Sequence, residues 1–98
     1  MREIAEHEID FIEDIQYGTY IVDFWASWCP PCKAMEPILH SIDSEGLASV
    51  LKVNADEHIE LSQKYNVRSL PTMIIFKDGV EVERIIGAVS KENITKIL

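Results

Sequence analysis

The two cysteines of this 98-residue chain, Cys29 and Cys32, lie three positions apart in the stretch W-C-P-P-C. Such a pair can form a structural disulfide, contribute ligands to a metal site, or cycle between a dithiol and a disulfide. A disulfide that closes so short a loop stabilises a fold by only about 2 kcal/mol and constrains little else. The spacing therefore disfavours a purely structural role.

A metal site is also disfavoured by the other residues of the chain. A structural zinc ion commonly takes four ligands from two cysteine pairs, and no second pair is present. The histidines are His7, His40 and His58. His40 follows Cys32 on the same predicted helix, about 12 Å along its axis, which is too far for the two side chains to share one ion. A site shared between two chains stays open.

The redox alternative agrees best with the position of the pair. Cys29 follows a predicted strand and precedes a predicted helix, where unpaired N–H groups and the helix dipole stabilise a thiolate. Cys29 is therefore the expected nucleophile. Cys32 comes three positions later on the same face of the first turn, so it can attack a mixed disulfide on Cys29 and release the product. A C-x-x-C motif after a strand in a β-α-β pattern is typical of dithiol redox proteins.

Hydrophobic patterning predicts the elements that position the pair. The apolar, β-branched run at residues 19–26 predicts a buried strand before the cysteines, and a helix is predicted to begin at Pro31, a favourable first helical residue. The remaining predictions are an edge strand at 2–6, an amphipathic helix at 7–16, a strand at 48–55, a helix at 57–65 capped by Asp56, strands at 72–77 and 80–87 joined by Asp78-Gly79, and a helix at 90–98 capped by Ser90.

This order of elements predicts an α/β fold in a single domain, residues 1–98. Strands that alternate with helices pair in parallel through right-handed crossovers, and the terminal hairpin adds antiparallel pairing. We therefore expect a central mixed β-sheet with helices on both faces.

Composition narrows the function. The formal net charge of −8 argues against nucleic-acid binding and against binding to an anionic membrane surface. No apolar run is long enough to span a bilayer, and the acidic N-terminal stretch lacks the apolar segment of a signal peptide. We expect a cytoplasmic protein. In that compartment thiols are kept reduced, so a cysteine pair is more often catalytic or metal-binding than structural.

The sequence resembles the thioredoxin family over nearly its whole length. The motifs that carry the resemblance are VDFWASWCPPCK, SLPT, FKDG and IIGA, which stand in the family's order and at its spacing. The resemblance implies a thioredoxin fold and thiol–disulfide exchange with protein disulfides. It also implies that the cysteine pair is the only redox group, with no separate cofactor and no metal.

Asp23 is a candidate for proton transfer. In the strand it shares a face with Ile21 and Trp25, so it should be buried, and a buried unpaired carboxylate tends to stay protonated near neutral pH. The resemblance gives Asp23 the role of a proton relay for Cys32, and it implies that Lys52 tunes Asp23 by its charge. An aspartate turned to solvent and an ordinary surface lysine are the alternatives.

The resemblance also implies a surface for client proteins around the cysteines. Pro71 would follow a cis peptide bond and face the pair, and the backbone of Leu70 would pair with an incoming peptide. Trp28 would shape this surface, whereas packing in the core explains Trp25 at least as well as a role at the surface. The expected surface consists of Trp28, Pro30, Pro31, Leu70, Pro71, Gly87 and Ala88.

Pro30 departs from the family, which usually has glycine at this position. Proline has no N–H and a fixed φ, so Pro30 removes one potential donor near the Cys29 sulfur. We therefore expect the reduced form to be less stabilised and the pair to be more reducing than in a glycine version, although stiffness of the loop acts as well and its sign is open.

These inferences lead to a thiol–disulfide oxidoreductase that reduces protein disulfides. The alternatives are a disulfide oxidase or isomerase, and a binding module that uses the fold without turnover. By resemblance, electrons come from a separate NADPH-dependent flavoprotein reductase. No glycine-rich nucleotide-binding fingerprint follows any strand of this chain. We expect a monomer.

Overall fold

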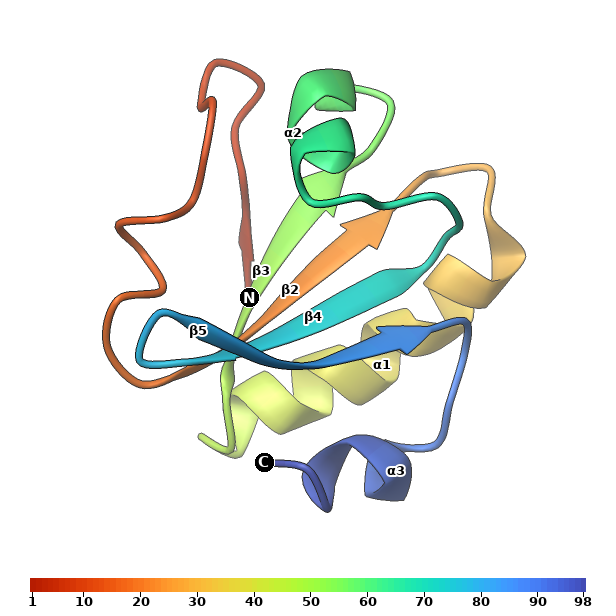
Figure 1. Cartoon of the computed structure of the whole chain (residues 1–98). Helices are drawn as coiled ribbons and strands as arrows, with labels where there is room; N and C mark the ends of the chain where they lie inside the picture. The colour runs from red at the N-terminus through yellow and green to blue at the C-terminus, as the bar shows by residue number, and fades with distance from the viewer.

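Five strands form one mixed sheet at the centre of the computed structural model, which describes residues 1–98 (Figure 1). Their order across the sheet is β1-β3-β2-β4-β5. The pairs β1–β3 and β3–β2 are parallel and β4–β5 is an antiparallel hairpin, as the order of elements predicts. The β2–β4 pair is antiparallel, which the sequence did not predict, because β4 follows a helix and alternation with helices suggested parallel pairing. The strands are β1 (Arg2–Glu3), β2 (Thr19–Trp25), β3 (Ser49–Asn54), β4 (Thr72–Lys77) and β5 (Val80–Ile86).

Three helices cover the two faces of this sheet, which confirms the predicted layering. They are α1 (Pro30–Ser44), α2 (Ile59–Lys64) and α3 (Lys91–Thr95). Figure 1 shows α1 and α3 on one face and α2 on the other. None of the helices is long and apolar enough to cross a membrane.

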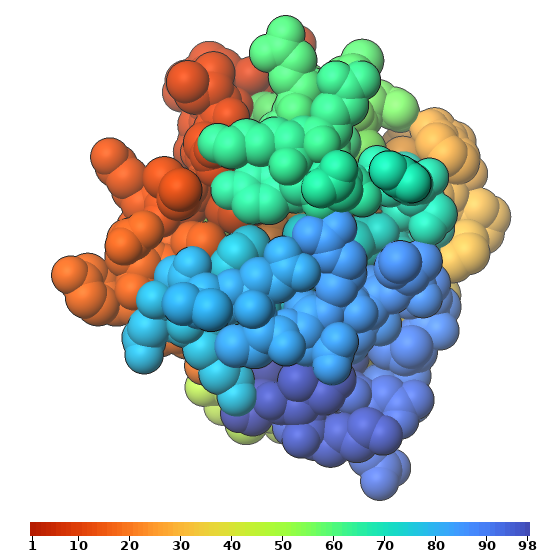
Figure 2. Space-filling model, in the orientation of Figure 1, coloured from red at the N-terminus to blue at the C-terminus, as the bar shows by residue number.

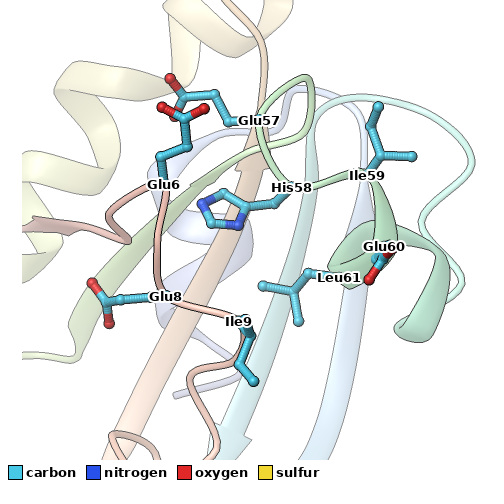
Figure 3. Close-up of a pocket in the computed structure, with 8 residues that line it drawn as sticks. All are labelled: Glu6, Glu8, Ile9, Glu57, His58, Ile59, Glu60 and Leu61. Atoms are coloured by element: carbon cyan, nitrogen blue, oxygen red, sulfur yellow. The ribbon is translucent and has the colours of Figure 1, made fainter.

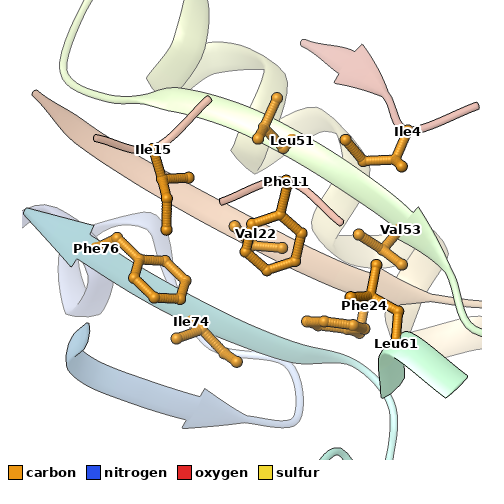
Figure 4. Close-up of a cluster of buried hydrophobic side chains, with 10 residues drawn as sticks. All are labelled: Ile4, Phe11, Ile15, Val22, Phe24, Leu51, Val53, Leu61, Ile74 and Phe76. Carbon is orange, nitrogen blue, oxygen red and sulfur yellow. The ribbon is translucent and has the colours of Figure 1, made fainter. Parts of the chain in front are cut away.

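Each face of the sheet has its own hydrophobic core. Beneath α1 and α3, Met35, Leu39 and Ile94 pack against Ile21 and Met73 of the sheet. On the other face the strands pack against Leu61 of α2 and against the segment before β2. Figure 4 shows this second cluster with the Phe11 ring near its centre; its members are Ile4, Phe11, Ile15, Val22, Phe24, Leu51, Val53, Leu61, Ile74 and Phe76.

The helix predicted for residues 7–16 is wrong, because this segment forms turns and irregular backbone. Phe11 and Ile15 are both buried, at the spacing that suggested a helix. However, the Phe11 amide donates to the carboxylate of Asp10 and the Ala5 amide donates to that of Glu8. Acidic side chains thus satisfy backbone donors locally, and such bonds compete with a helical pattern. Arg2 links Glu8 to another turn residue, Asp14.

Asp56 does not cap the second helix, which begins two residues later than predicted. The residue at the N-cap position is His58, and its side chain makes no capping hydrogen bond. The amides of Glu57 and His58 instead donate to the carbonyl of Asn54 at 3.1 and 3.0 Å. The end of β3 therefore extends into a turn that satisfies these donors. Asn66, just after the helix, has a left-handed conformation with φ of 57°.

The hairpin and the last helix agree with the sequence pattern. Asp78 and Gly79 connect β4 to β5 with φ of 48° and 84°, the positive values that a tight two-residue hairpin requires. The Ser90 hydroxyl accepts the Asn93 amide at 3.2 Å and caps α3, as predicted. The edge strand is confirmed as β1 but is limited to Arg2–Glu3.

Candidate active site

The cysteine pair lies where β2 leads into α1. Cys29 occupies the N-cap of α1, and its backbone amide donates to the Ala26 carbonyl at 3.2 Å, which closes the turn after β2. Cys29 and Cys32 form a disulfide with their Cα atoms 5.3 Å apart. The helix begins at Pro30, one residue earlier than predicted, because the φ that proline imposes suits both first helical positions.

The Cys29 sulfur occupies the place of a capping side chain. It accepts the Cys32 amide at 3.2 Å, and the Cys29 carbonyl accepts the Lys33 amide at the same distance. Pro30 and Pro31 have no N–H. The amide of Cys32 is therefore the one donor that the first turn directs at this sulfur. A hydrogen bond and a helix N-terminus both stabilise negative charge on Cys29 over Cys32.

The disulfide is buried beneath an exposed surface. Each cysteine is only 3% exposed, so burial of the residues does not distinguish their roles. Leu70 and Trp25 pack against the small cluster that the pair forms with Ala26. Trp28 is 66% exposed, and its indole N–H donates to the Asp56 carboxylate at 2.9 Å. The predicted surface residues Pro30, Pro31 and Ala88 are exposed.

Two loops from later in the chain complete this end of the molecule. The Leu70–Pro71 peptide bond is cis, as the resemblance implied, and Pro71 is buried. The Gly87 amide donates to the Pro71 carbonyl at 2.9 Å, which joins the loop after β5 to the cis-proline turn. Gly87 has φ of 89°, a value that glycine adopts readily. Figure 2 shows the gold segment at the start of α1 at the surface beside the teal loop that follows α2.

Asp23 is buried on the face of β2 that α1 covers. It is 2% exposed, and its Oδ1 atom has no hydrogen-bond partner. The pKa of this carboxyl is raised to about 7, chiefly by burial. The Lys52 charge lowers it, and the charges of Glu36 and Glu3 raise it. The prediction that Asp23 is buried is therefore confirmed, and the raised pKa agrees with the expected tendency of this carboxyl to hold a proton near neutral pH. Such a group can both take and return a proton under working conditions.

Lys52 is buried and stands next to Asp23, but its partner is a different carboxylate. Lys52 is paired in register with Asp23 of β2 and with Glu3 of β1, so the three side chains share one face of the sheet. The Lys52 ammonium lies 2.6 Å from Oε2 of Glu36 and 4.3 Å from the centre of the Trp25 ring. The Trp25 indole donates to Glu3 at 3.1 Å.

Sequence reasoning missed Glu36 and Glu3, which complete this cluster. Glu36 follows Cys32 by one helical turn, so helical spacing could have placed it on the same side of α1. Glu3 could be found only from the pairing of β1 with β3, because no local pattern connects residue 3 to residue 52.

A separate hollow lies on the other face of the molecule, beside α2. It has a volume of about 290 Å³ and is bordered by Glu6, Glu8, Glu57 and Glu60 around His58. The imidazole projects from the turn before α2 toward the segment that carries Glu6 and Glu8 (Figure 3). Its Nε2 atom lies 3.4 Å from the Ile4 carbonyl oxygen. The cysteines do not border this hollow, and no group of His, Cys, Asp or Glu side chains is arranged to hold a metal ion.

Taken together, the geometry at the N-terminal end of α1 supports dithiol–disulfide exchange. One sulfur sits at a helix N-terminus, the second is bonded to it, and a carboxyl with a raised pKa is buried on the face that the same helix covers. An exposed indole, two prolines and a turn preceding β4 surround the pair. These are the features that a macromolecular disulfide would meet on approach.

Comparison with known proteins assigns the chain to a family. A family model described as Thioredoxin matches residues 3–98. A thioredoxin of Staphylococcus aureus is 43% identical over 93 residues, which cover 93% of this chain and 89% of that protein.

Solved structures agree over the whole fold. A mutant thioredoxin from Halobacterium salinarum superposes with a TM-score of 0.86 at 29% identity, covering 99% of this chain and 85% of that one. A thioredoxin of Plasmodium falciparum has a TM-score of 0.85 at 29% identity, with 99% and 96% covered. The predicted thioredoxin fold is thus confirmed. The chain belongs to the thioredoxin family and is a thiol–disulfide oxidoreductase.

Proposed function

We propose that this protein-disulfide reductase works through Cys29 as the attacking thiolate, Cys32 as the resolving thiol and Asp23 as the proton carrier. The observation that carries the proposal is the Cys29–Cys32 disulfide at the start of α1, with the Cys32 amide directed at the Cys29 sulfur. The thiolate is the reactive form of cysteine, and both the hydrogen bond and the helix terminus favour it at Cys29.

The reaction consists of two exchanges. The Cys29 thiolate attacks one sulfur of the client disulfide, forms a mixed disulfide and releases the first client thiolate. The Cys32 thiol then gives its proton to the Asp23 carboxylate and attacks the Cys29 sulfur. This step releases the second client thiolate and leaves the Cys29–Cys32 disulfide. Two electrons have moved to the client, and protonated Asp23 can return the proton when the pair is reduced again.

Client proteins bind at the exposed surface around the pair. Trp28 is held by Asp56 and offers an apolar ring, and Leu70 packs beside the sulfurs just before the cis bond. An extended client segment would place its cysteine over the Cys29–Cys32 pair and form hydrogen bonds with the backbone of Leu70. Lys52 acts on the reaction through the charge it presents to Asp23. The proposed client surface consists of Trp28, Pro30, Pro31, Leu70, Gly87 and Ala88. Pro71, also predicted for this surface, is buried and shapes the turn that carries Leu70.

Each turnover consumes the two electrons that one chain stores, so an external donor must restore the dithiol. The donor we propose is an NADPH-dependent flavoprotein reductase, and the chain acts as a single-domain monomer without a further cofactor. A cytoplasmic location fits this direction of electron flow, because that compartment is kept reducing. Oxidation of NADPH by a bacterial thioredoxin reductase, followed with and without this protein, tests the donor. Sedimentation at micromolar concentration tests the monomer.

Turnover of insulin disulfides with dithiothreitol as the electron donor tests the roles of the cysteines. The wild type should accelerate the reduction, whereas Cys29→Ser and Cys32→Ser should not. When reduced Cys32→Ser is mixed with insulin without dithiothreitol, it should accumulate a mixed disulfide, because Cys29 still attacks and no thiol resolves the product. A wild type no faster than dithiothreitol alone would support a binding module. A redox potential near that of strong oxidants would support the oxidase direction instead.

A further inference from the structure

The sheet face under α1 carries a cluster of three carboxylates and one ammonium. Asp23, Lys52 and Glu3 lie at one level across β2, β3 and β1, and Glu36 approaches Lys52 from α1. On the other side of Asp23 its register partner is the apolar Met73 of β4. Lys52 is thus the one cation among these side chains, and the acids compete for it.

The Lys52 ammonium could reach Asp23 as well as Glu36. Neighbouring strands lie about 4.8 Å apart, so a side chain with four methylene groups can place its ammonium near Asp23 as well as near α1. In the structure the ammonium lies 2.6 Å from Glu36 and over the Trp25 ring, and it makes no ion pair with Asp23. The Oδ1 atom of Asp23 has no partner at all.

We propose that Glu36 is a positioning residue: it holds the Lys52 ammonium away from Asp23, so that Asp23 remains an unpaired acid able to carry the proton of Cys32. This inference rests on the proposed role of Asp23 and adds a residue that acts on it through Lys52. Trp25 and Glu3 support the same arrangement, because the indole lies under the ammonium and is itself held by Glu3.

The physical basis is the strength of a contact between opposite charges where water is excluded. An opposite charge within hydrogen-bonding distance favours the ionised carboxylate and lowers its pKa by about 1 to 3 units. With Lys52 on Glu36, burial dominates at Asp23. Loss of the Glu36 charge frees the ammonium to turn toward the remaining buried carboxylate. With a lower pKa, Asp23 would be a weaker base for the Cys32 proton and could not hold that proton near neutral pH.

Titration of the Asp23 carboxyl by carbon-13 NMR of the oxidised protein tests the inference, because no thiol titrates in that form. In Glu36→Gln the midpoint should fall by about one pH unit. Glu45→Gln is the matched control: Glu45 also pairs with a lysine, and its side chain has the same 50% exposure as Glu36. It lies at the far end of α1 and should leave the Asp23 midpoint unchanged.

The same titration in a Lys52→Met background separates positioning from direct repulsion between Glu36 and Asp23. If Glu36 acts through Lys52, adding Glu36→Gln to Lys52→Met moves the midpoint by less than a third of its effect in the wild type. An equal effect in both backgrounds, or no effect of Glu36→Gln alone, overturns the inference. Lys52→Gln replaces the methionine variant if the latter does not fold.

A separate measurement tests whether Asp23 carries a proton during turnover. The titration observes Asp23 itself, whether or not that residue carries a proton during turnover. Insulin reduction by Asp23→Asn across pH reports the catalytic role. A Glu36-dependent Asp23 midpoint combined with an unchanged pH profile of Asp23→Asn would therefore reject the role of Asp23 and leave the placement of Lys52 intact.

Discussion

The Cys29 sulfur depends on a single backbone donor, because the two residues that follow it are prolines. A capping side chain normally accepts from the second or third amide of its helix. Here the second helical residue is Pro31, which has no N–H. The only capping donor is therefore the Cys32 amide, whose nitrogen lies 3.2 Å from the Cys29 sulfur. Reduction of the disulfide places charge on this sulfur, so each donor that is present or missing changes the balance between the two redox forms.

Replacing Pro30 should therefore shift the redox potential. Pro30→Gly adds an N–H beside Cys29, which stabilises the reduced form and should make the potential less negative by about 10 to 30 mV. Equilibration with glutathione buffers measures it. Pro30→Ala separates the effect of the added N–H from the effect of loop flexibility, since alanine restores the N–H with less backbone freedom than glycine. An equal shift in both variants indicates the donor. An unchanged or more negative potential in Pro30→Gly contradicts the argument.

The carboxyl of Asp23 makes stability depend on pH. Its pKa is about 7 in the folded protein against 3.8 as the ordinary value, so the folded state binds the proton more tightly. The resulting stabilisation is fully present below about pH 4 and is lost as the pH rises through 7. Asp23→Asn removes the buried charge, and its free energy of unfolding at pH 9 should exceed that of the wild type by up to about 4 kcal/mol.

Urea denaturation of the oxidised proteins at several pH values checks this prediction. The two proteins should differ little at pH 4, where Asp23 is protonated in the wild type. The gap should begin to open near pH 4, widen steadily as the pH rises toward 7, and level off above it. A constant difference across the whole range would mean that the asparagine changes packing and that the charge of Asp23 contributes nothing.

Among the elements, the segment before β2 behaves least as its sequence suggests. Its apolar residues have helical spacing, and two of them do reach the core, but the backbone forms turns. The spacing of hydrophobic residues predicts which side chains are buried. It does not predict which acceptors the backbone amides bond to. The strands and the hairpin were predictable because their signals are local, such as β-branched runs and Asp78-Gly79.

A pair of neighbouring substitutions tests this view of the segment. Phe11 is fully buried, stacks on Tyr65 with ring centres 4.8 Å apart, and meets Phe24 and Phe76 edge-on. Phe11→Ala should lower the free energy of unfolding by about 3 to 5 kcal/mol. Ile12 is 51% exposed, so Ile12→Ala should change it by less than about 0.5 kcal/mol. Comparable losses in chemical denaturation would mean that both residues face the core.

The sequence also predicted the candidate site unevenly. Cys29, Cys32 and Asp23 were found because each stands in or beside a local motif and has a chemical reason to be there. The ion pair of Lys52 was not foreseen, because its partner is chosen by the packing of α1 over β3. Contacts between elements depend on register and helix rotation, which no single stretch of sequence specifies.

At the scale of the whole molecule, the chain carries a net charge of −8 and faces its substrates with that field around it. Acidic residues also stand near the site, since Asp56 holds Trp28 at the surface. A field of one sign raises the local concentration of oppositely charged partners and accelerates their approach. Cationic clients should therefore be reduced faster than anionic ones by a mechanism that involves no specific contact.

Two peptides with the same disulfide, flanked either by three lysines or by three glutamates, test this prediction. At about 10 mM salt the reduced protein should react with the cationic peptide roughly tenfold faster or more, because the Debye length of about 30 Å is comparable to the molecule itself. Near 1 M salt, where that length is about 3 Å, the ratio should approach one. Stopped-flow fluorescence of the two tryptophans measures both rates. A ratio that persists at high salt would assign the preference to direct contacts beside the cysteines, because screening removes only the long-range part of the attraction.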